Sequence, residues 1–349
     1  MTQHAIRYTT LNEALALYDK DIYELGEQAD SIRTDYHGKK VFFNSNAHLN
    51  PTNECSDVCR FCGFSAHRKN PHPYTMTKDE VLARVDEVVA NGALEIHIVG
   101  AHNPNCDLQW YCDVFANIKK RHPSLHIKAM TAAEVHFLAS NAGIAFEDVL
   151  EKMAESGVDS MPGGGAEIFD EKLRHSICKG KVSASGWLAI HRHWHKMGKK
   201  SNATMLFGHI ESRAHRIDHL LRLQQLQAET GGFNAFIPLV YQKENNFLQV
   251  TDFPTGQEIL KTIAIARILL PNIPHIKAYW ATLGINMAMV AQEFGADDLD
   301  GTIQKESIQS AGGAGSAGGI TKSELVFQVK NAGFVPVERD TLYNEIHVY

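Results

Sequence analysis

Residues 41–64 read VFFNSNAHLNPTNECSDVCRFCGF, an extended stretch that runs directly into a cluster of cysteines. We predict a strand over Val41–Asn50. The loop after it carries Cys55, Cys59 and Cys62 in the spacing C-x3-C-x2-C. Three thiols in one short loop can converge on a single metal centre, and coordination to a metal lowers their pKa. The stretch therefore indicates a strand followed by a metal-binding loop.

The rest of the chain repeats this order of strand and helix. Further strands are predicted at Leu94–Gly100, His126–Thr131, Val158–Pro162, Ser201–His209, Asn234–Val240, His275–Leu283 and Leu299–Ile303. Helical patterns lie at Lys78–Ala90, Leu108–Arg121, Ala145–Ser156, Ser185–Met197, His215–Glu229, Gly256–Leu270 and Met287–Phe294. Strands that alternate with helices in this way predict an α/β fold, a (β/α)8 barrel of the TIM type. The cysteine loop then lies at the C-terminal mouth of the barrel, where active sites gather.

Three regions are expected along the chain. Residues 1–36 form a helical lead-in, residues 37–310 the barrel, and residues 311–349 a glycine-rich loop with a C-terminal helix and strand packed on the barrel. Gly312–Gly319 is either a flexible connector or a mobile lid over a ligand. A last helix is expected at Lys322–Asn331, followed by an extended tail.

Composition and charge narrow the class of protein. The 349 residues carry 34 Lys and Arg against 40 Asp and Glu, a formal net charge of −6, so no broad basic field exists to follow a nucleic-acid backbone. Six cysteines are too few for a disulfide scaffold in a chain of this length. The N-terminus lacks the features of a signal peptide, and no stretch of 18 apolar residues occurs. We therefore expect a cytoplasmic location and no membrane partner.

Two inorganic interpretations of the cysteine loop compete. A structural zinc ion takes four ligands, and here the fourth would have to be His67 or His72, because no second CxxC follows. An iron–sulfur cluster takes cysteine thiolates. Three thiolates on a [4Fe–4S] cluster leave one iron open for a small ligand.

The cysteine spacing, with Phe61 directly before the last cysteine, resembles the signature of the radical S-adenosylmethionine enzymes. Longer strings resemble one family among them, the aminodeoxyfutalosine synthases, from about residue 40 to residue 345. These strings are HLNPTN at 48–53, VGAHNP at 99–104, KAMTAAE at 128–134, SMPGGGAEIF at 160–169, SNATMLFGHIE at 201–211 and PVERDTLY at 336–343.

This resemblance implies a specific reaction. The family adds the 5′-deoxyadenosyl radical to the enolpyruvyl double bond of 3-[(1-carboxyvinyl)oxy]benzoate. The adduct rearranges and loses its carboxylate, which gives 6-amino-6-deoxyfutalosine on a route to menaquinone. S-adenosylmethionine is consumed as a co-substrate, and an electron donor such as flavodoxin or ferredoxin is required. Two alternatives stay open: the sibling cyclase that acts on dehypoxanthine futalosine, and a non-enzymatic module with a zinc clip.

The resemblance also implies site residues around the cofactors. Cys55, Cys59 and Cys62 are the expected [4Fe–4S] ligands, and Phe61 is expected beside the cluster and the adenine. The S-adenosylmethionine contacts are expected at the ends of the second, third and fourth strands, from Gly100, Ala101, His102, Thr131, Glu134, Gly163 and Gly164. The second predicted strand of the chain ends in GAH where many relatives have GGE, so no acid is expected to contact the cofactor there. Glu134 has the alternative role of an acid at a helix start.

Substrate contacts are expected from polar residues on the inner faces of strands. Asn202 and Thr204 lie on one face of their strand, and His48 shares a face with Asn50 in the same way. His209, the last residue of the predicted strand that carries Asn202 and Thr204, is also expected to contact the substrate. Arg339 is expected to bind a substrate carboxylate or, alternatively, to form a salt bridge with Asp340 or Glu338. The remaining cysteines, Cys106, Cys112 and Cys178, have no motif spacing and no expected role.

Overall fold

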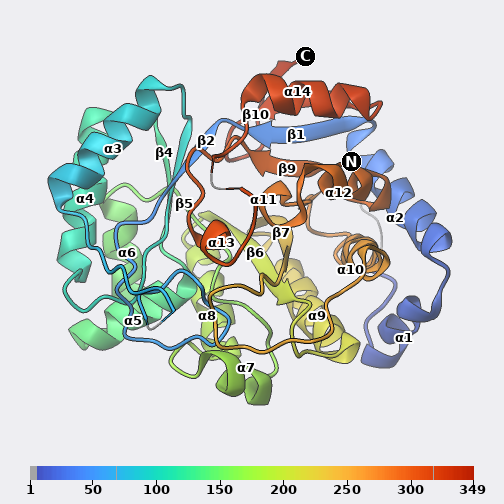
Figure 1. Cartoon of the computed structure of the whole chain (residues 1–349), viewed down its shortest axis with the longest axis horizontal. Helices are drawn as coiled ribbons and strands as arrows, with labels where there is room; N and C mark the ends of the chain where they lie inside the picture. The colour runs from blue at the N-terminus through green and yellow to red at the C-terminus, as the bar shows by residue number, and fades with distance from the viewer. Residues whose placement is uncertain (1–5, 68, 317) are drawn as a thin grey trace.

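The computed structural model describes residues 6–67, 69–316 and 318–349. Seven parallel strands form one curled sheet in the order of the sequence. They are β2 (Asn46–Leu49), β3 (Glu95–Ile98), β4 (His126–Ala129), β5 (Ser160–Met161), β6 (Lys200–Phe207), β7 (Phe233–Val240) and β8 (His275–Ile276). The predicted barrel architecture is confirmed, with helices surrounding the strands (Figure 1).

Strand β9 (Asp298–Gly301) closes the barrel between the first and last strands of this sheet. On one side the Ala278 amide donates to the Asp298 carbonyl at 2.8 Å. On the other side the amide of Gln304, just after β9, donates to the carbonyl of Asn46 in β2 at 3.1 Å. Backbone hydrogen bonds therefore continue around the whole ring of strands, and no strand edge of the barrel is left open at this point.

A second sheet of four strands stands beside the barrel, in the order β11-β10-β1-β9. Its members besides β9 are β1 (Lys40–Asn44), β10 (Val335–Arg339) and β11 (Glu345–Val348). The predicted strand at 41–50 is thus two strands, β1 and β2, separated by Ser45. The break occurs because β1 pairs in parallel with the C-terminal β10, whereas β2 pairs with β3.

Helices cover the outside of the barrel. Their bounds are α3 (Lys78–Ala90), α4 (Leu108–Arg121), α5 (Ala132–Ala142), α6 (Phe146–Glu155), α7 (Glu171–Cys178), α8 (Ala184–Lys196), α9 (Arg213–Thr230) and α10 (Gly256–Leu269). Most of the helical patterns in the sequence are confirmed within a few residues, and α5 and α7 were not predicted. Helix α3 begins with a capping box between Thr77 and Glu80, which satisfies amide groups that have no partner within the helix.

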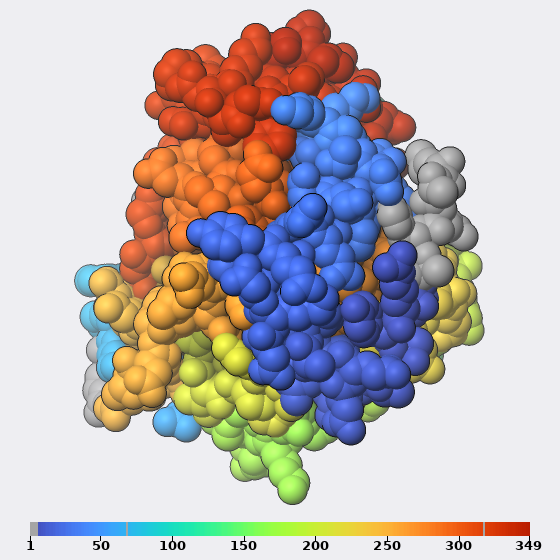
Figure 2. Space-filling model, turned by 90° about the vertical axis from the view of Figure 1, so that its right-hand side faces the viewer, coloured from blue at the N-terminus to red at the C-terminus, as the bar shows by residue number. Residues whose placement is uncertain are grey.

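The two ends of the chain pack on the barrel. The N-terminal α1 (Leu11–Leu15) and α2 (Ile22–His37) lie against α9 and α10, and Figure 2 shows this dark blue segment across the surface. Near the other end α14 (Lys322–Asn331) confirms the predicted last helix and packs on β10. No helix among the described residues is long and apolar enough to cross a membrane.

One predicted strand is largely wrong. Only His275–Ile276 of the stretch 275–283 is a strand, and Trp280–Leu283 forms the short helix α11. The chain turns there because the indole of Trp280 enters the core and donates to the Gly301 carbonyl at 2.8 Å. Two more short helices flank β9 in the sequence: α12 (Ile285–Val290) comes before it and α13 (Ile308–Ala311) comes after it.

Candidate active site

A cavity of about 270 Å³ opens at the carboxyl ends of the barrel strands. It collects most of the residues that the sequence singled out. Those that line it are Cys55, Cys59, Cys62, Phe61, Gly100, Ala101, His102, Thr131, Glu134, Gly163, Gly164, His48, Asn202 and Thr204. Segments that are far apart in the sequence thus meet at one site, as expected for the mouth of a (β/α)8 barrel.

The cysteine loop is anchored on both sides of the cavity. The Ser56 amide donates to the His102 carbonyl at 2.9 Å, and the Arg60 amide donates to the Ile177 carbonyl at 2.8 Å. Cys59 is buried, Cys55 and Cys62 are half-buried, and all three thiols are free. Burial raises the pKa of the Cys55 and Cys59 thiols. These thiols are therefore protonated at neutral pH until a metal centre takes up their sulfur atoms.

The three sulfur atoms are too widely spaced in this structure for a single zinc ion. Tetrahedral zinc with bonds of about 2.3 Å would bring its ligand sulfurs to within about 4 Å of one another. Among the described residues, the only trio of ligand atoms within 4.8 Å of one another is that of His37, His275 and Asp297, remote from the cysteine loop. Three free thiols on one loop that lines the cavity suit an iron–sulfur cube, which binds each thiolate through a different iron.

The end of strand β3 is tied to the cysteine loop. The His102 amide donates to the Cys55 sulfur at 3.4 Å, and His102 Nδ1 lies 2.6 Å from Asp57 Oδ2. This histidine lowers the pKa of the Asp57 carboxyl through their hydrogen bond. The His102 ring stacks on Phe137 with centroids 4.8 Å apart. The His102 side chain therefore holds the cysteine loop in place.

Thr131 and Glu134 form the capping box of α5, and Glu134 has a second contact. Its Oε2 accepts from the Thr131 amide at 2.7 Å, and its Oε1 accepts from the Gly100 amide at 2.7 Å. The carboxylate, only 3% exposed, thus joins the ends of β3 and β4. Both residues line the cavity. Glu134 therefore lies where it can act both as the acid at the start of α5 and as a contact to a cofactor.

The glycines after β5 allow close packing as well as access to the cavity. A Cβ on Gly163 would lie 2.7–2.8 Å from the β6 backbone at residues 202–204. On Gly164 it would lie 2.8 Å from the Thr131 side chain. Strand β6 also holds this turn, since Thr204 Oγ1 donates to the Gly163 carbonyl at 2.6 Å.

Gly163→Ala is therefore expected to destabilise the protein by about 1–3 kcal/mol, because backbone atoms cannot move aside as a side chain can. Urea unfolding of the variant measures this loss. Gly315→Ala is the matched control, since a Cβ there meets nothing within 4 Å. Equal stability of the two variants would contradict the close approach of the Gly163 turn to β6.

Below the mouth, one side of the barrel interior is polar. Glu95 and His97 on β3, Lys128 on β4 and Asp300 at the end of β9 line the cavity, and none of them was predicted. Lys128 Nζ donates to Glu95 Oε2 at 2.8 Å. The signal was present in the sequence, because Glu95 and His97 alternate with apolar neighbours in the same way as Asn202 and Thr204 do.

Three residues predicted to bind substrate do not line the cavity. The side-chain Nδ2 of Asn50 donates to the Val99 carbonyl at 2.7 Å, which fixes two strand ends. His209 is buried beside Glu211 and interacts with the Leu206 carbonyl. Arg339 is 1% exposed and donates to Asp298 Oδ2 at 2.6 Å, so it has a salt bridge, with a different partner from the two expected.

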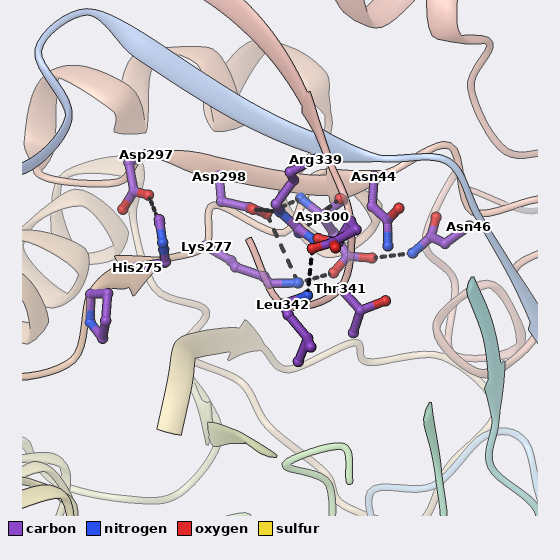
Figure 3. A network of polar contacts seen from close by, with 12 residues as sticks. Asn44, Asn46, His275, Lys277, Asp297, Asp298, Asp300, Arg339, Thr341 and Leu342 are labelled. Atoms are coloured by element: carbon purple, nitrogen blue, oxygen red, sulfur yellow. Dashed lines mark hydrogen bonds and ion pairs between the residues drawn. The ribbon is translucent and has the colours of Figure 1, made fainter. Parts of the chain in front are cut away.

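The acidic residues around β9 form a connected network (Figure 3). Asp298 pairs with Arg339 of β10, and Asp300 pairs with Lys277 next to β8 at 2.5 Å. Asp297 accepts from buried Arg267 of α10. Each carboxylate thus holds a cation from a different element to the strand that closes the barrel.

The segment before the glycine-rich stretch covers part of the cavity. Ile308 and Gln309 of α13 and Gly312 after it are lining residues. The Glu244 amide donates to the Gly312 carbonyl at 2.9 Å, and a Cβ on Gly63 of the cysteine loop would meet the Ala311 carbonyl oxygen at 2.8 Å. The segment is therefore packed against the cysteine loop in this structure.

Comparison with known proteins agrees with this site. The model of the radical SAM superfamily matches residues 49–223, and that of the CofH/MqnC C-terminal region matches residues 230–348. The chain is 42% identical to aminodeoxyfutalosine synthase of Thermus thermophilus, over 97% of this chain and 93% of that protein. It is 38% identical to 5-amino-6-(D-ribitylamino)uracil–L-tyrosine 4-hydroxyphenyl transferase of Archaeoglobus fulgidus, over 95% of this chain and 96% of that protein.

The fold is shared with solved structures. The crystal structure of methylornithine synthase has a TM-score of 0.75 at 17% identity, with 95% of this chain and 94% of that chain covered. The chain belongs to the radical SAM superfamily of enzymes, whose members use a [4Fe–4S] cluster and S-adenosylmethionine. Within it, the chain is a full-length relative of the aminodeoxyfutalosine synthases. The alternative of a non-enzymatic zinc clip is therefore wrong.

Proposed function

We propose that this enzyme is an aminodeoxyfutalosine synthase of menaquinone biosynthesis. It joins the 5′-deoxyadenosyl group to the enolpyruvyl carbon of 3-[(1-carboxyvinyl)oxy]benzoate, and rearrangement with loss of the carboxylate gives 6-amino-6-deoxyfutalosine. The observation that carries the proposal is 42% identity over nearly the full length to a synthase of that name. A bound cluster and S-adenosylmethionine supply the 5′-deoxyadenosyl radical.

The residues of this chain bind, orient and shield the reactants. Cys55, Cys59 and Cys62 are proposed to hold the cluster at the mouth, and Phe61 lies beside them in the same cavity. The Lys181 ammonium lies 5.3 Å from the centre of the Phe61 ring and pairs with Glu167 at 2.6 Å. This contact keeps the ring at the cavity wall, where an adenine can stack on it.

The cofactor residues are proposed to line one edge of the cavity, from Gly100 through Thr131 to Gly164. The substrate then lies deeper, between the polar wall and the side chains of Ile237 and Leu239 on β7. Packing of α13 against the cysteine loop limits the access of water to this space. Exclusion of water protects a reactive radical from side reactions.

The test is an anaerobic incubation of cluster-loaded protein with S-adenosylmethionine, dithionite and each candidate substrate. Mass spectrometry is expected to find 6-amino-6-deoxyfutalosine and methionine with the enolpyruvyl benzoate. Dehypoxanthine futalosine is expected to give no cyclised product. Tyrosine with 5-amino-6-(D-ribitylamino)uracil, the pair in the names of the archaeal relatives, is expected to give no coupled product. Turnover of either alternative in place of the benzoate would overturn the proposal.

An external one-electron donor completes the proposed function, and flavodoxin or ferredoxin is the expected kind. Replacement of dithionite by reduced flavodoxin in the same incubation is expected to sustain product formation. The enzyme is proposed to act in the cytoplasm on this small-molecule substrate.

A further inference from the structure

We propose that His48 and His97 together bind the benzoate carboxylate of the substrate, and that this carboxylate brings one proton onto the pair when it binds. The inference rests on the proposed function, because it takes the substrate from there. It adds a residue, His97, that the sequence did not single out, and it assigns the source of the positive charge for an anionic substrate.

The two histidines face each other across β2 and β3, inside the cavity. They are register partners in the parallel pairing of these strands. His97 Nδ1 lies 3.3 Å from His48 Nε2, and the ring centroids are 4.7 Å apart at nearly a right angle. His97 Nε2 is buried and has no hydrogen-bond partner in the structure. A buried polar atom without a hydrogen-bond partner is destabilising. A ligand atom that forms a hydrogen bond with it therefore gains binding free energy.

The other cationic side chains that line the cavity are already paired. Lys128 donates to Glu95, Lys181 lies 2.6 Å from Glu167, and His102 lies 2.6 Å from Asp57. A buried carboxylate needs a positive partner as well as hydrogen bonds. Among the described residues that line the cavity, His48 and His97 are therefore the groups left to provide new positive charge.

The hydrogen bonding of the pair explains the proton. Only one hydrogen fits between His97 Nδ1 and His48 Nε2, so the neutral pair carries a hydrogen on just one of its two outer nitrogens. Uptake of a proton from solvent places a hydrogen on both outer nitrogens. The pair then has a charge of plus one, which matches the charge of a carboxylate, and His97 Nε2, the buried nitrogen without a partner, donates to one of the carboxylate oxygens.

The surroundings keep the pair neutral until a carboxylate arrives. Burial lowers the pKa of both histidines. The groups that face them are Glu95 on their own sheet, Lys128 on β4, and Asp300 and Glu306 at and after β9. The carboxylates favour the charged form and Lys128 opposes it, but Glu95 and Asp300 are themselves paired with lysines. A bound carboxylate adds an unpaired negative charge and so raises the pKa of the pair.

The depth of the pair and the opposite wall fit an aromatic acid. His97 is the last residue but one of β3 and comes three residues before Gly100, so it lies up to about 10 Å below that glycine at the mouth. Across the cavity stand Leu206, Ile237 and Leu239. A benzene ring can lie on this apolar wall with its carboxylate at the histidines, while the enolpyruvyl group points up to the mouth.

The experiment is titration calorimetry on the cluster-loaded enzyme with S-adenosylmethionine and without a reductant, so that no turnover occurs. The titrant is 3-[(1-carboxyvinyl)oxy]benzoate, in buffers of different ionisation enthalpy between pH 6.5 and 8. Wild-type enzyme is expected to take up about one proton per bound molecule. Because the bound state holds the extra proton, the Kd is expected to rise up to about tenfold per pH unit.

His97→Gln keeps a hydrogen-bonding side chain but cannot take up a proton. We expect its Kd to be about 30-fold higher at pH 6.5, with no proton uptake and no pH slope. His48→Gln is expected to behave in the same way. The matched control is His126→Gln on β4, whose ring interacts with Ser160 Oγ at 2.7 Å outside the cavity lining. It is expected to keep the wild-type Kd and proton uptake.

Two failures can be told apart. If wild-type enzyme does not bind the benzoate at all, the proposed substrate is wrong and the role of the pair falls with it. If wild-type enzyme binds without proton uptake, or if His97→Gln binds with the wild-type Kd and pH slope, the substrate stands and the carboxylate site at the histidines is overturned.

Discussion

Replacing Cys59 by alanine is expected to abolish formation of 6-amino-6-deoxyfutalosine while the barrel stays folded. Loss of an outer partner of a metal ligand already lowers affinity or activity about 10- to 100-fold, so loss of a ligand is expected to lower activity more than about a thousandfold. Anaerobically reconstituted Cys59→Ala is also expected to contain less iron and sulfide. It is expected to lose the brown colour and the absorption band at about 400 nm that are typical of such clusters.

A second cysteine provides the control for this prediction. Cys178 at the end of α7 is as buried as Cys59, close enough to influence its pKa, but outside the C-x3-C-x2-C loop. Cys178→Ala is expected to retain iron, sulfide and activity, because a buried thiol of this kind acts as a small apolar side chain. Circular dichroism checks that both variants fold. Full turnover by Cys59→Ala would contradict the assignment of the cluster to this loop.

The order of strands and helices could be predicted because each element carries its own local pattern. The failures occur where distant segments decide the structure. The predicted strand at 41–50 breaks at Ser45, whose carbonyl accepts from the Leu94 amide at 2.7 Å and whose Oγ donates to Glu338 at 2.7 Å. A partner almost 300 residues away leaves no trace in the local pattern. In the same way, the contact between Trp280 and Gly301 turns a predicted strand into α11.

Residues of the candidate site could be predicted where their position after a strand places them at the cavity. They could not be predicted where a side chain forms its hydrogen bonds with other groups inside the protein. The cysteine motif and the glycine turn after β5 both line the cavity, as their positions after strands indicated. Arg339 and Asn50 also lie near strand ends, but a carboxylate and a carbonyl inside the protein already bind them. His97 was missed because a single histidine in a short strand carries no motif, and only its unpartnered nitrogen draws attention to it.

Arg339→Met is expected to lower the free energy of unfolding by about 3 kcal/mol, because it leaves the buried carboxylate of Asp298 with only the more distant Lys277 ammonium, 3.9 Å from Oδ1, as a cation. Both side chains are at most 1% exposed, and Arg339 also donates to the carbonyls of Asp300 and Asp340 at 3.2 and 3.1 Å. The salt bridge joins β10 to β9, so its loss loosens the C-terminal sheet and the closure of the barrel together. Urea unfolding of wild type and variant measures the difference.

Two further measurements separate this structural role from substrate binding. Asp298→Asn in the Arg339→Met background removes the carboxylate charge that has lost its nearer cation and keeps an oxygen for the Asp300 amide, which donates to Asp298 Oδ1 at 2.6 Å. We expect the double variant to recover about half of the lost stability, since coupled charges are not additive. The KM for the benzoate is expected to stay within about twofold of wild type in the folded single variant, because Arg339 does not line the cavity. A large rise in KM at unchanged stability would show instead that the guanidinium leaves Asp298 to bind the substrate.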